Sequence, residues 1–268
     1  MLAIILPKLT ATINHDNMVE YFLGSIPLNA MVGKRLGIYF QSWRVCMHCG
    51  VERRGFFKDS AYCNACFFSL ASCDFCQMQP AKCHYHLGTC REPKWGEAHC
   101  MITHYVYLSY TSSLKVGVTR FYNIPKRWID QGAIRAMPLI ATSNRLTAGV
   151  IEKHLTQYVS DRTMWKKMLK TPNDYLPTPD LMTEGKRLIA LAQPFLATCT
   201  NIQICQTEPT IIKYPAPFFN TEFTSLNLVK LGQVEGVLLG IKGNYCIMDI
   251  GVINLSKFFG CIVKINLE

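Results

Sequence analysis

The sequence predicts an α+β protein in which β-rich segments at both ends flank a cysteine-rich module and a mixed helix-and-strand core. Strand-like apolar runs near both termini, a cysteine-dense stretch without periodicity and helical patterns in the centre carry this prediction. The 268 residues, 49% of them hydrophobic, suffice for about two domains with buried cores. The expected regions are a β-rich segment (1–45), a cysteine-rich module (46–103), an α/β domain (104–196) and a β-rich segment (197–268) that can pack with the first.

The elements follow from local patterns. Apolar and β-branched runs predict strands at 36–40, 104–108, 115–119, 234–241, 245–250 and 261–265. The second and third of these runs are expected to form a hairpin around a turn at 111–113. Pro125 suits the first turn of a helix, further helices are expected over 147–159 and 183–196, and the prolines of 171–183 predict a loop.

Thirteen cysteines need an explanation, and nine of them lie between residues 46 and 100. The N-terminal apolar run of five residues at 2–6 is shorter than a signal peptide core, and no stretch is long enough to span a membrane. We therefore expect a cytoplasmic protein without membrane association. Disulfides do not persist in that compartment, so clustered thiols indicate metal binding. The four scattered thiols, Cys199, Cys205, Cys246 and Cys261, are expected to be small buried side chains.

The first cysteine group has the spacing Cys46-x2-Cys49, thirteen residues, then Cys63-x2-Cys66. Each Cys-x2-Cys pair can present two thiolates to one ion, and two pairs complete the tetrahedral coordination that zinc favours. Four thiolates leave no open position for substrate. The pattern therefore predicts a structural, zinc-ribbon-like site that contributes folding energy.

A second group follows, with more potential ligands than one ion needs. Its preferred ligand set is Cys73, Cys76, Cys83 and Cys90, with Cys100 as the leading substitute. His84, His86, His99 and His104 lie nearby in the sequence but are left out of the set, because a lone histidine among cysteines is more often a neighbour than a ligand. The chain is thus expected to hold one or two structural zinc ions.

The net charge of +10 is concentrated in one segment. Residues 101–170 carry 11 basic and 3 acidic side chains, whereas the remainder of the chain is nearly balanced. A basic face of this kind attracts polyanions, phosphate backbones above all, although a solubilising surface is the alternative. The segment predicts a nucleic-acid partner, DNA or RNA. Tyr105, Trp128 and Trp165 are candidates for base stacking, with core packing as the favoured alternative for at least two of them.

Short motifs in the same segment resemble the GIY-YIG nuclease superfamily over about residues 104–160. They are Tyr105-Val106-Tyr107, Lys115-Val116-Gly117-Val118-Thr119, Arg127 and Glu152. The resemblance implies a GIY-YIG-like α/β core in which Tyr107 and Gly117 belong to the two strand motifs. It also implies that Arg127 stabilises phosphate charge in the transition state and that Glu152 holds a divalent cation such as magnesium.

The segment departs from the nuclease pattern at Lys115, where the nucleases have a tyrosine implicated in proton transfer, and in a longer gap between Gly117 and Arg127. Loss of such a group typically costs about 10²–10⁴ in rate. The departure favours a core that keeps phosphate binding and has lost cleavage. The residues expected to contact nucleic acid are Lys115, Gly117, Arg120, Lys126, Arg135, Arg145, Lys166 and Lys167, with Tyr107, Arg127 and Glu152 as the catalytic candidates.

Nearly the whole chain also resembles a bacterial family of unknown function, number 2797. The matching stretches are 88–93, Trp95-Gly96, 104–108, 115–120, 127–133, 240–243 and 251–254. This resemblance also points to Asp161 and Arg162, and it implies no activity.

Three functions therefore remain open: a zinc-containing nucleic-acid-binding protein with a degenerate nuclease-like core, an active magnesium-dependent endonuclease, and a non-enzymatic adapter whose zinc module docks a partner.

Overall fold

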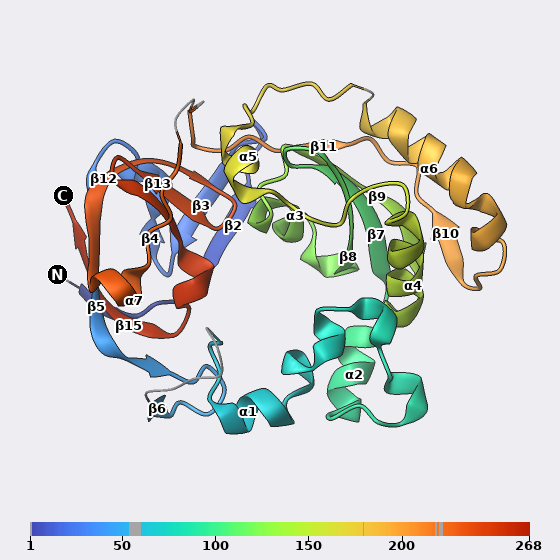
Figure 1. Cartoon of the computed structure of the whole chain (residues 1–268), viewed down its shortest axis with the longest axis horizontal. Coiled ribbons are helices and arrows are strands. Elements are labelled where there is room, and N and C mark those ends of the chain that lie inside the picture. The colour runs from blue at the N-terminus through green and yellow to red at the C-terminus, as the bar shows by residue number, and fades with distance from the viewer. Residues whose placement is uncertain (1, 54–59, 179, 218, 220–221) are drawn as a thin grey trace. The chain divides into compact units, whose positions relative to one another are not determined.

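The structure of the chain, a computed structural model, describes residues 2–53, 60–178, 180–217, 219 and 222–268 (Figure 1). It divides into two compact units: Met1–Phe68 with Lys213–Glu268, and Ser69–Ile212. Helices and strands are present in similar amounts, which confirms the predicted mixture of the two. The first four cysteines fall in the first unit and the next five in the second, so the predicted module at 46–103 is divided between the units.

The first unit is built on an antiparallel sheet that joins the two ends of the chain. Its strands run in the order β1 (Leu2–Ile5), β15 (Cys261–Leu267), β5 (Arg35–Val45), β12 (Gln233–Lys242), β13 (Tyr245–Met248) and β14 (Gly251–Asn254), with β6 (Glu52–Arg53) paired to β5. The strands predicted near both termini fall on β5, β12, β13 and β15. Val263 is fully buried between more exposed neighbours, as expected of a sheet with one covered face, and Ile38 is also fully buried.

Shorter elements complete this unit. A three-stranded antiparallel sheet contains β2 (Leu9–Ile13), β3 (Val19–Leu23) and β4 (Ile26–Pro27). Helix α7 (Leu228–Leu231) precedes β12, and α1 (Asn64–Ser69) carries the last of the first four cysteines. Tyr21 and Leu28 are buried, which gives the smaller sheet its own contribution to the core.

The second unit contains a separate sheet with the order β10 (Ile202–Ile204), β9 (Arg135–Thr142), β7 (His104–Tyr110) and β8 (Leu114–Arg120); β11 (Thr210–Ile211) also pairs with β9. The predicted hairpin is confirmed, because β7 and β8 pair along their whole length with Tyr107 opposite Gly117. Strand β8 lies at the edge of the sheet. Its outer side is bridged by Ser160, whose carbonyl accepts a hydrogen bond from the Val116 N–H at 2.9 Å.

Two helices cover one face of this sheet. Helix α4 (Arg145–Leu155) and helix α6 (Leu181–Leu196) contribute buried leucines, isoleucine and alanines to a cluster with alternate residues of β7 and β8. Asn144 caps α4 by accepting from the Thr147 N–H at 2.9 Å, so the helix begins two residues before the predicted start and ends at Leu155 rather than residue 159. The predicted helix at 183–196 corresponds to α6, which Asp180 caps in the same way.

The opposite face carries α3 (Lys126–Asp130), which follows Pro125 as predicted. Its Trp128 is buried against Tyr107, with ring centroids 6.3 Å apart. Helices α2 (Pro93–Cys100) and α5 (Trp165–Lys170) complete the unit. Of the four scattered thiols, Cys246 and Cys261 are buried as predicted; for Cys199 and Cys205 the prediction is wrong, because both are only partly buried.

Candidate functional site

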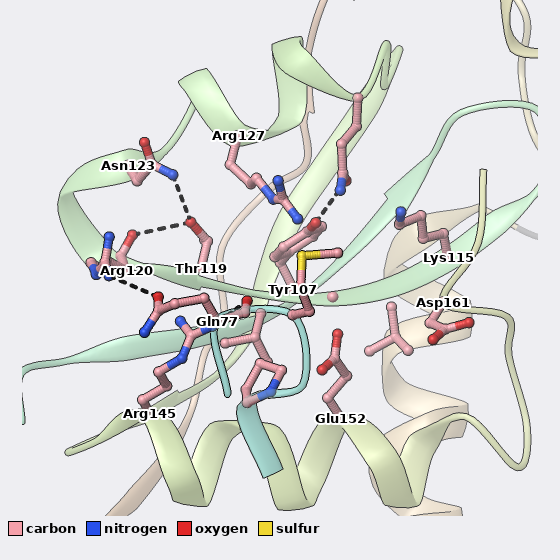
Figure 2. A pocket seen from close by; sticks show the side chains of 16 residues that line it. Gln77, Tyr107, Lys115, Thr119, Arg120, Asn123, Arg127, Arg145, Glu152 and Asp161 are labelled. Atoms are coloured by element: carbon pink, nitrogen blue, oxygen red, sulfur yellow. Dashed lines mark hydrogen bonds between the residues drawn. The ribbon is translucent and has the colours of Figure 1, made fainter. Parts of the chain in front are cut away.

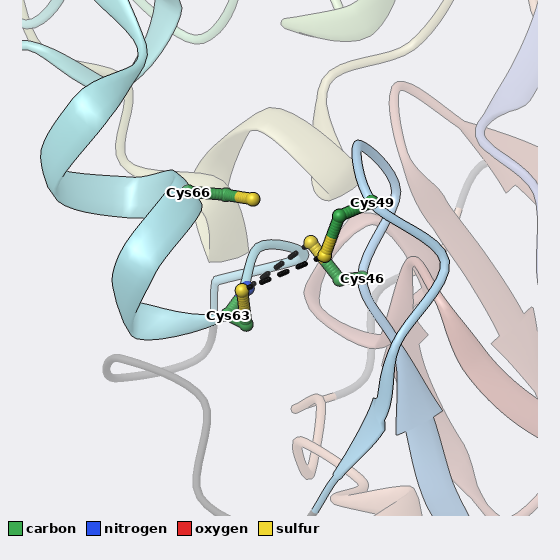
Figure 3. Close-up of side chains that lie close together, drawn as sticks. All are labelled: Cys46, Cys49, Cys63 and Cys66. Carbon is green, nitrogen blue, oxygen red and sulfur yellow. Dashed lines mark hydrogen bonds between the residues drawn. The ribbon is translucent and has the colours of Figure 1, made fainter.

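The first cysteine group converges on one point (Figure 3). The sulfurs of Cys46, Cys49, Cys63 and Cys66 all lie within 4.8 Å of one another, and those of Cys49 and Cys63 are 3.8 Å apart. Two sulfurs bound to one zinc ion at about 2.3 Å in tetrahedral geometry are separated by ~3.8 Å. The four thiols, which we call the cysteine quartet, are therefore close enough together to hold one four-coordinate metal ion.

Local backbone structure explains this convergence. Strand β5 ends at Val45, and a tight turn follows in which the Gly50 N–H donates to the Cys46 carbonyl at 2.9 Å. Gly50 has a φ of 72°, which favours glycine. The Cys63 N–H donates to the Cys46 sulfur at 3.3 Å. Burial opposes ionisation of Cys46, but donation by backbone N–H groups lowers the pKa of its thiol to about 6. This turn therefore favours the thiolate, the form that binds metals.

The second predicted metal set, Cys73, Cys76, Cys83 and Cys90, is not gathered in the same way. Among the described residues, no group of three metal-binding side chains includes Cys73, Cys83 or Cys90. The Cys83 thiol instead lies between those of Cys100 and Cys76; hydrogen bonding to both lowers the pKa of Cys83 and raises the pKa of each neighbour. The Cys90 sulfur packs against Gly96 of α2 and reaches the Glu92 carbonyl at 3.5 Å.

A second compact group consists of Asp74, Cys76 and His84. The Asp74 carboxylate accepts from the Cys76 N–H at 3.1 Å and pairs with Arg91 at 2.8 Å and with His84 at 3.5 Å. These partners hold the pKa of Asp74 below its usual value although burial opposes them. With a guanidinium already bound to the carboxylate, the group is better explained as an ion-pair cluster than as a cation site.

The largest concentration of candidate side chains surrounds a cavity of about 320 Å³ at the β8 edge, which we call the basic pocket (Figure 2). Seven of the eleven candidates from the basic segment line it: Tyr107, Lys115, Gly117, Arg120, Arg127, Arg145 and Glu152. They come from β7, β8, α3 and α4. Arg127 reaches the pocket from α3 on one face of the sheet, and Glu152 reaches it from α4 on the other.

Tyr107 and Gly117 form the wall of the basic pocket on the α3 side. An added Cβ at Gly117 would lie about 2.5 Å from the Tyr107 Cζ, so only glycine admits the ring at this cross-strand pair. Tyr107 is 1% exposed, and its hydroxyl donates to Gln131 Oε1 at 2.7 Å. Burial raises the pKa of Tyr107, although Arg127 opposes this shift. Tyr107 is therefore a neutral hydrogen-bond donor near neutral pH.

The cations of the basic pocket differ in how they are held. Arg127 is exposed, whereas Arg145 is 7% exposed and donates to the Gln77 carbonyl at 2.8 Å and the Cys76 carbonyl at 3.4 Å. Arg120 donates to the His99 carbonyl at 2.8 Å. Backbone oxygens orient these two guanidiniums without neutralising them. The pocket thus keeps a positive charge that an anion can offset.

Lys115 and Glu152 have strongly altered proton affinities. Lys115 is 6% exposed and donates to Thr163 Oγ1 at 3.2 Å; burial, with Arg127, lowers its pKa to about 8. Burial, with the Asp161 carboxylate, raises the pKa of Glu152 to about 7, although Arg127 and Lys115 oppose this shift. Altered pKa values around one cavity are typical of functional sites.

Four candidates lie outside the basic pocket: Lys126, Arg135, Lys166 and Lys167. Lys126 pairs with Asp130 at 2.7 Å on α3, and the Lys166 ammonium lies 5.7 Å from the Trp165 ring centroid. Trp128 is 2% exposed, so for this residue the alternative of core packing holds and base stacking does not. These positions show that basic composition alone does not identify which cations share a cavity.

The candidate set missed several polar residues that line the pocket, among them Gln77, Thr119, Asn123 and Gln131, and it did not include Asp161. Asp161 is brought there by the bridge between Ser160 and β8. Only the family resemblance pointed to Asp161. Gln77 comes from the cysteine-rich region, 30 residues before Tyr107, and no sequence pattern linked the two.

A comparison with known protein families identifies the family of the chain. Residues 33–263 match the model of a family described as protein of unknown function, DUF2797. The chain belongs to this family. The DUF2797 match covers the cysteine quartet and every residue of the basic pocket. No curated protein and no solved structure matches the chain significantly. Among the described residues of this DUF2797 protein, no helix is long and apolar enough to cross a membrane.

Proposed function

We propose that this protein binds nucleic acid and that its basic pocket receives a backbone phosphate. One observation carries the proposal: Lys115, Arg120, Arg127 and Arg145 line a single cavity that holds only two carboxylates, Glu152 and Asp161. A phosphodiester is the anion that such guanidiniums bind with paired hydrogen bonds. The Tyr107 hydroxyl lies beside them, and it adds no negative charge because it stays protonated and donates to Gln131 Oε1.

The charge around the basic pocket favours a polymer over a small anion. Besides Lys126, which pairs with Asp130, three candidates lie outside the cavity and can attract successive phosphates over a Debye length of about 10 Å: Arg135, Lys166 and Lys167. The GIY-YIG-like order of strand, strand, helix, strand and helix in β7, β8, α3, β9 and α4 is consistent with a phosphodiester-binding core. The proposal does not distinguish DNA from RNA.

The cysteine quartet is proposed to hold zinc. The sulfur separation matches tetrahedral coordination, and an all-thiolate set is typical of structural zinc. Cys46, Cys49, Cys63 and Cys66 would fill the coordination sphere, so the ion supplies folding energy and no open position for a substrate.

The test compares Arg127→Ala with Lys126→Ala by fluorescence anisotropy on labelled DNA and RNA at several salt concentrations. Arg127 lines the pocket, whereas its neighbour Lys126 is paired with Asp130 and does not. Arg127→Ala is expected to weaken binding by about 1.5–3 kcal/mol, the value of a hydrogen bond to a charged group. Lys126→Ala is the matched control for loss of one positive charge and is expected to weaken binding much less.

Equal effects of the two substitutions would show that only overall charge matters and would contradict binding in the pocket. If neither DNA nor RNA shifts the anisotropy at low salt, the nucleic-acid proposal is wrong, and the non-enzymatic adapter becomes the better explanation.

A second candidate, magnesium-dependent phosphodiester hydrolysis, is favoured by Glu152 and Arg127 facing the same cavity. Glu152 would hold the cation, and Arg127 would stabilise the charge that develops on the phosphate as water displaces the leaving oxygen. Lys115 occupies the position of the motif tyrosine, so proton transfer needs another group. Cleavage of labelled strands that requires magnesium and is lost in Glu152→Gln would establish this activity; intact strands would exclude it.

A further inference from the structure

A second cavity, of about 330 Å³, adjoins the basic pocket in the same unit. It is lined by the segment 78–82, which includes the 3-10 turn η4 (Pro80–Lys82), and by residues of α4. The two cavities share Met78, Pro80, Glu152 and Asp161. The two cavities are therefore direct neighbours.

The second cavity has a different chemical lining. Met78, Pro80 and Ala81 form its apolar side, and Met78 is 81% exposed, an unusual position for a large apolar side chain. An exposed methionine offers a polarizable, adaptable surface for a flat apolar group. The arginines and the tyrosine of the basic pocket are absent from this lining. The cavity thus favours the apolar part of a ligand whose charged part lies in the adjoining basic pocket.

The second cavity has a fixed floor. Gly149 of α4 lies against η4 so closely that an added Cβ would be 2.3 Å from the Pro80 carbonyl carbon. Arg145, one turn earlier on α4, holds the preceding segment through the carbonyls of Cys76 and Gln77. Helix α4 therefore positions both the guanidinium of the first cavity and the apolar side of the second.

Positive charge continues beyond the apolar side. Lys82 and Lys153 line the second cavity, and both are exposed. The second cavity thus combines an apolar side with two cations, and it adjoins a pocket rich in guanidiniums. A nucleic-acid strand likewise carries a phosphate on each side of every internal nucleoside.

We propose that the second cavity seats the sugar and base of an unpaired nucleotide whose phosphate lies in the basic pocket, so that the preferred partner is single-stranded nucleic acid. This inference depends on the proposed function. In a duplex, every base is paired and stacked, and extruding one costs a few kcal/mol. A single strand presents its bases at much lower cost.

The experiment measures affinities of the zinc-loaded full-length protein for a labelled single strand and for a duplex of the same sequence. Wild type is expected to bind the single strand about tenfold or more tightly than the duplex, because extrusion of a base is avoided. Met78→Ala is expected to weaken single-strand binding about fivefold, from lost apolar burial, and to weaken duplex binding less, because Met78 also lines the basic pocket. Met78→Leu should retain most of the affinity, because leucine is apolar and similar in volume.

Met101→Ala is the matched control. Met101 is an exposed methionine of the same unit that lines neither cavity, and its removal is expected to leave single-strand binding unchanged. Lys153→Ala is expected to reduce the slope of log affinity against log salt by about 1, the loss of one phosphate contact.

The outcomes distinguish a failure of this inference from a failure of the proposed function. If single strands bind and Arg127→Ala weakens them, but Met78→Ala behaves like Met101→Ala, the nucleotide cavity is wrong and phosphate binding stands. Tighter binding of the duplex than of the single strand overturns the inference in the same way. If no nucleic acid binds at all, both the inference and the proposed function are wrong.

Discussion

The cysteine quartet and the basic pocket are assembled in opposite ways. The quartet uses four identical side chains from two sequence-local pairs, and its sulfurs all lie within 4.8 Å of one another with backbone N–H support. The basic pocket uses different residue types from two strands, two helices and the turns and loops around them, spread from Gln77 to Asp161. The ligands of the metal site can be recognised from their spacing in the sequence, whereas the residues of the pocket come together only after the sheet has formed.

This difference predicts different responses to substitution. Loss of one quartet thiolate removes part of a coordination sphere, whereas loss of one pocket side chain leaves the surrounding sheet in place. Substitutions in the quartet are expected to lower the stability of the fold, and substitutions in the pocket are expected to lower the affinity for nucleic acid.

The largest expected effect is that of Cys63→Ser. Zinc contributes on the order of 10 kcal/mol to the folding of zinc peptides, so loss of one thiolate is expected to cost several kcal/mol and to release the metal. Zinc content and thermal unfolding measure both effects. Cys205→Ser, at a partly buried thiol of the other unit, is the control and should keep the zinc. A Cys63→Ser protein that retains its zinc would contradict the expected difference between the quartet and the pocket.

A smaller effect is expected for Gly117→Ala. The new methyl group would meet the Tyr107 ring, and overpacking of this kind costs about 1–3 kcal/mol. Unfolding in denaturant measures the loss. In the double variant with Tyr107→Leu, which removes the ring, the cost of the alanine should largely disappear. Equal costs in both backgrounds would mean that the contact does not constrain the strand pair.

The smallest effect is a pH dependence of nucleic-acid binding in magnesium-free buffer. As the pH falls from 8.5 to 6, Lys115 gains a proton near 8 and Glu152 gains one near 7, so the pocket becomes more positive. Affinity is therefore expected to rise by up to about tenfold, the value of a 1.4 kcal/mol change. Glu152→Gln should remove the step near pH 7. An affinity that rises with pH would contradict this electrostatic picture.

The same Glu152 shift affects folding. The raised pKa means that the folded chain holds this proton more tightly than the unfolded chain, whose carboxyl has a pKa near 4.5. Stability is expected to fall as the pH rises from about 4.5 to 7, and the fall should be smaller in Glu152→Gln, as measured by thermal unfolding across that range.

Much of the architecture was readable from the sequence, because strands and helices leave local patterns. The β7–β8 hairpin, the helix after Pro125 and the two helices packed on the sheet occur where predicted. The predicted positions of the helix ends were less accurate, because the cap at Asn144 and the end at Leu155 depend on single side chains. The short 3-10 turns between Ala71 and Leu87 have no such pattern and were not predicted.

For the sites, local spacing identified the quartet but not the arrangement of the later thiols. The sequence distances among Cys76, Cys83 and Cys100 do not reveal that Cys83 lies between the other two thiols. The motif resemblance selected Tyr107, Gly117, Arg127 and Glu152, which the fold brings to one cavity. The roles assigned to them stay predictions. Met78 carried no signal at all, because its exposure depends on how η4 meets α4.

The bridge from Ser160 to Val116 has one more consequence. An open edge strand offers unpaired N–H and C=O groups to any other chain and invites intermolecular sheet extension. Here the segment that delivers Asp161 to the basic pocket also occupies the outer side of β8. Weakening that segment would therefore expose a template for aggregation together with the loss of a pocket carboxylate, so solubility and ligand binding are linked through a single stretch of backbone.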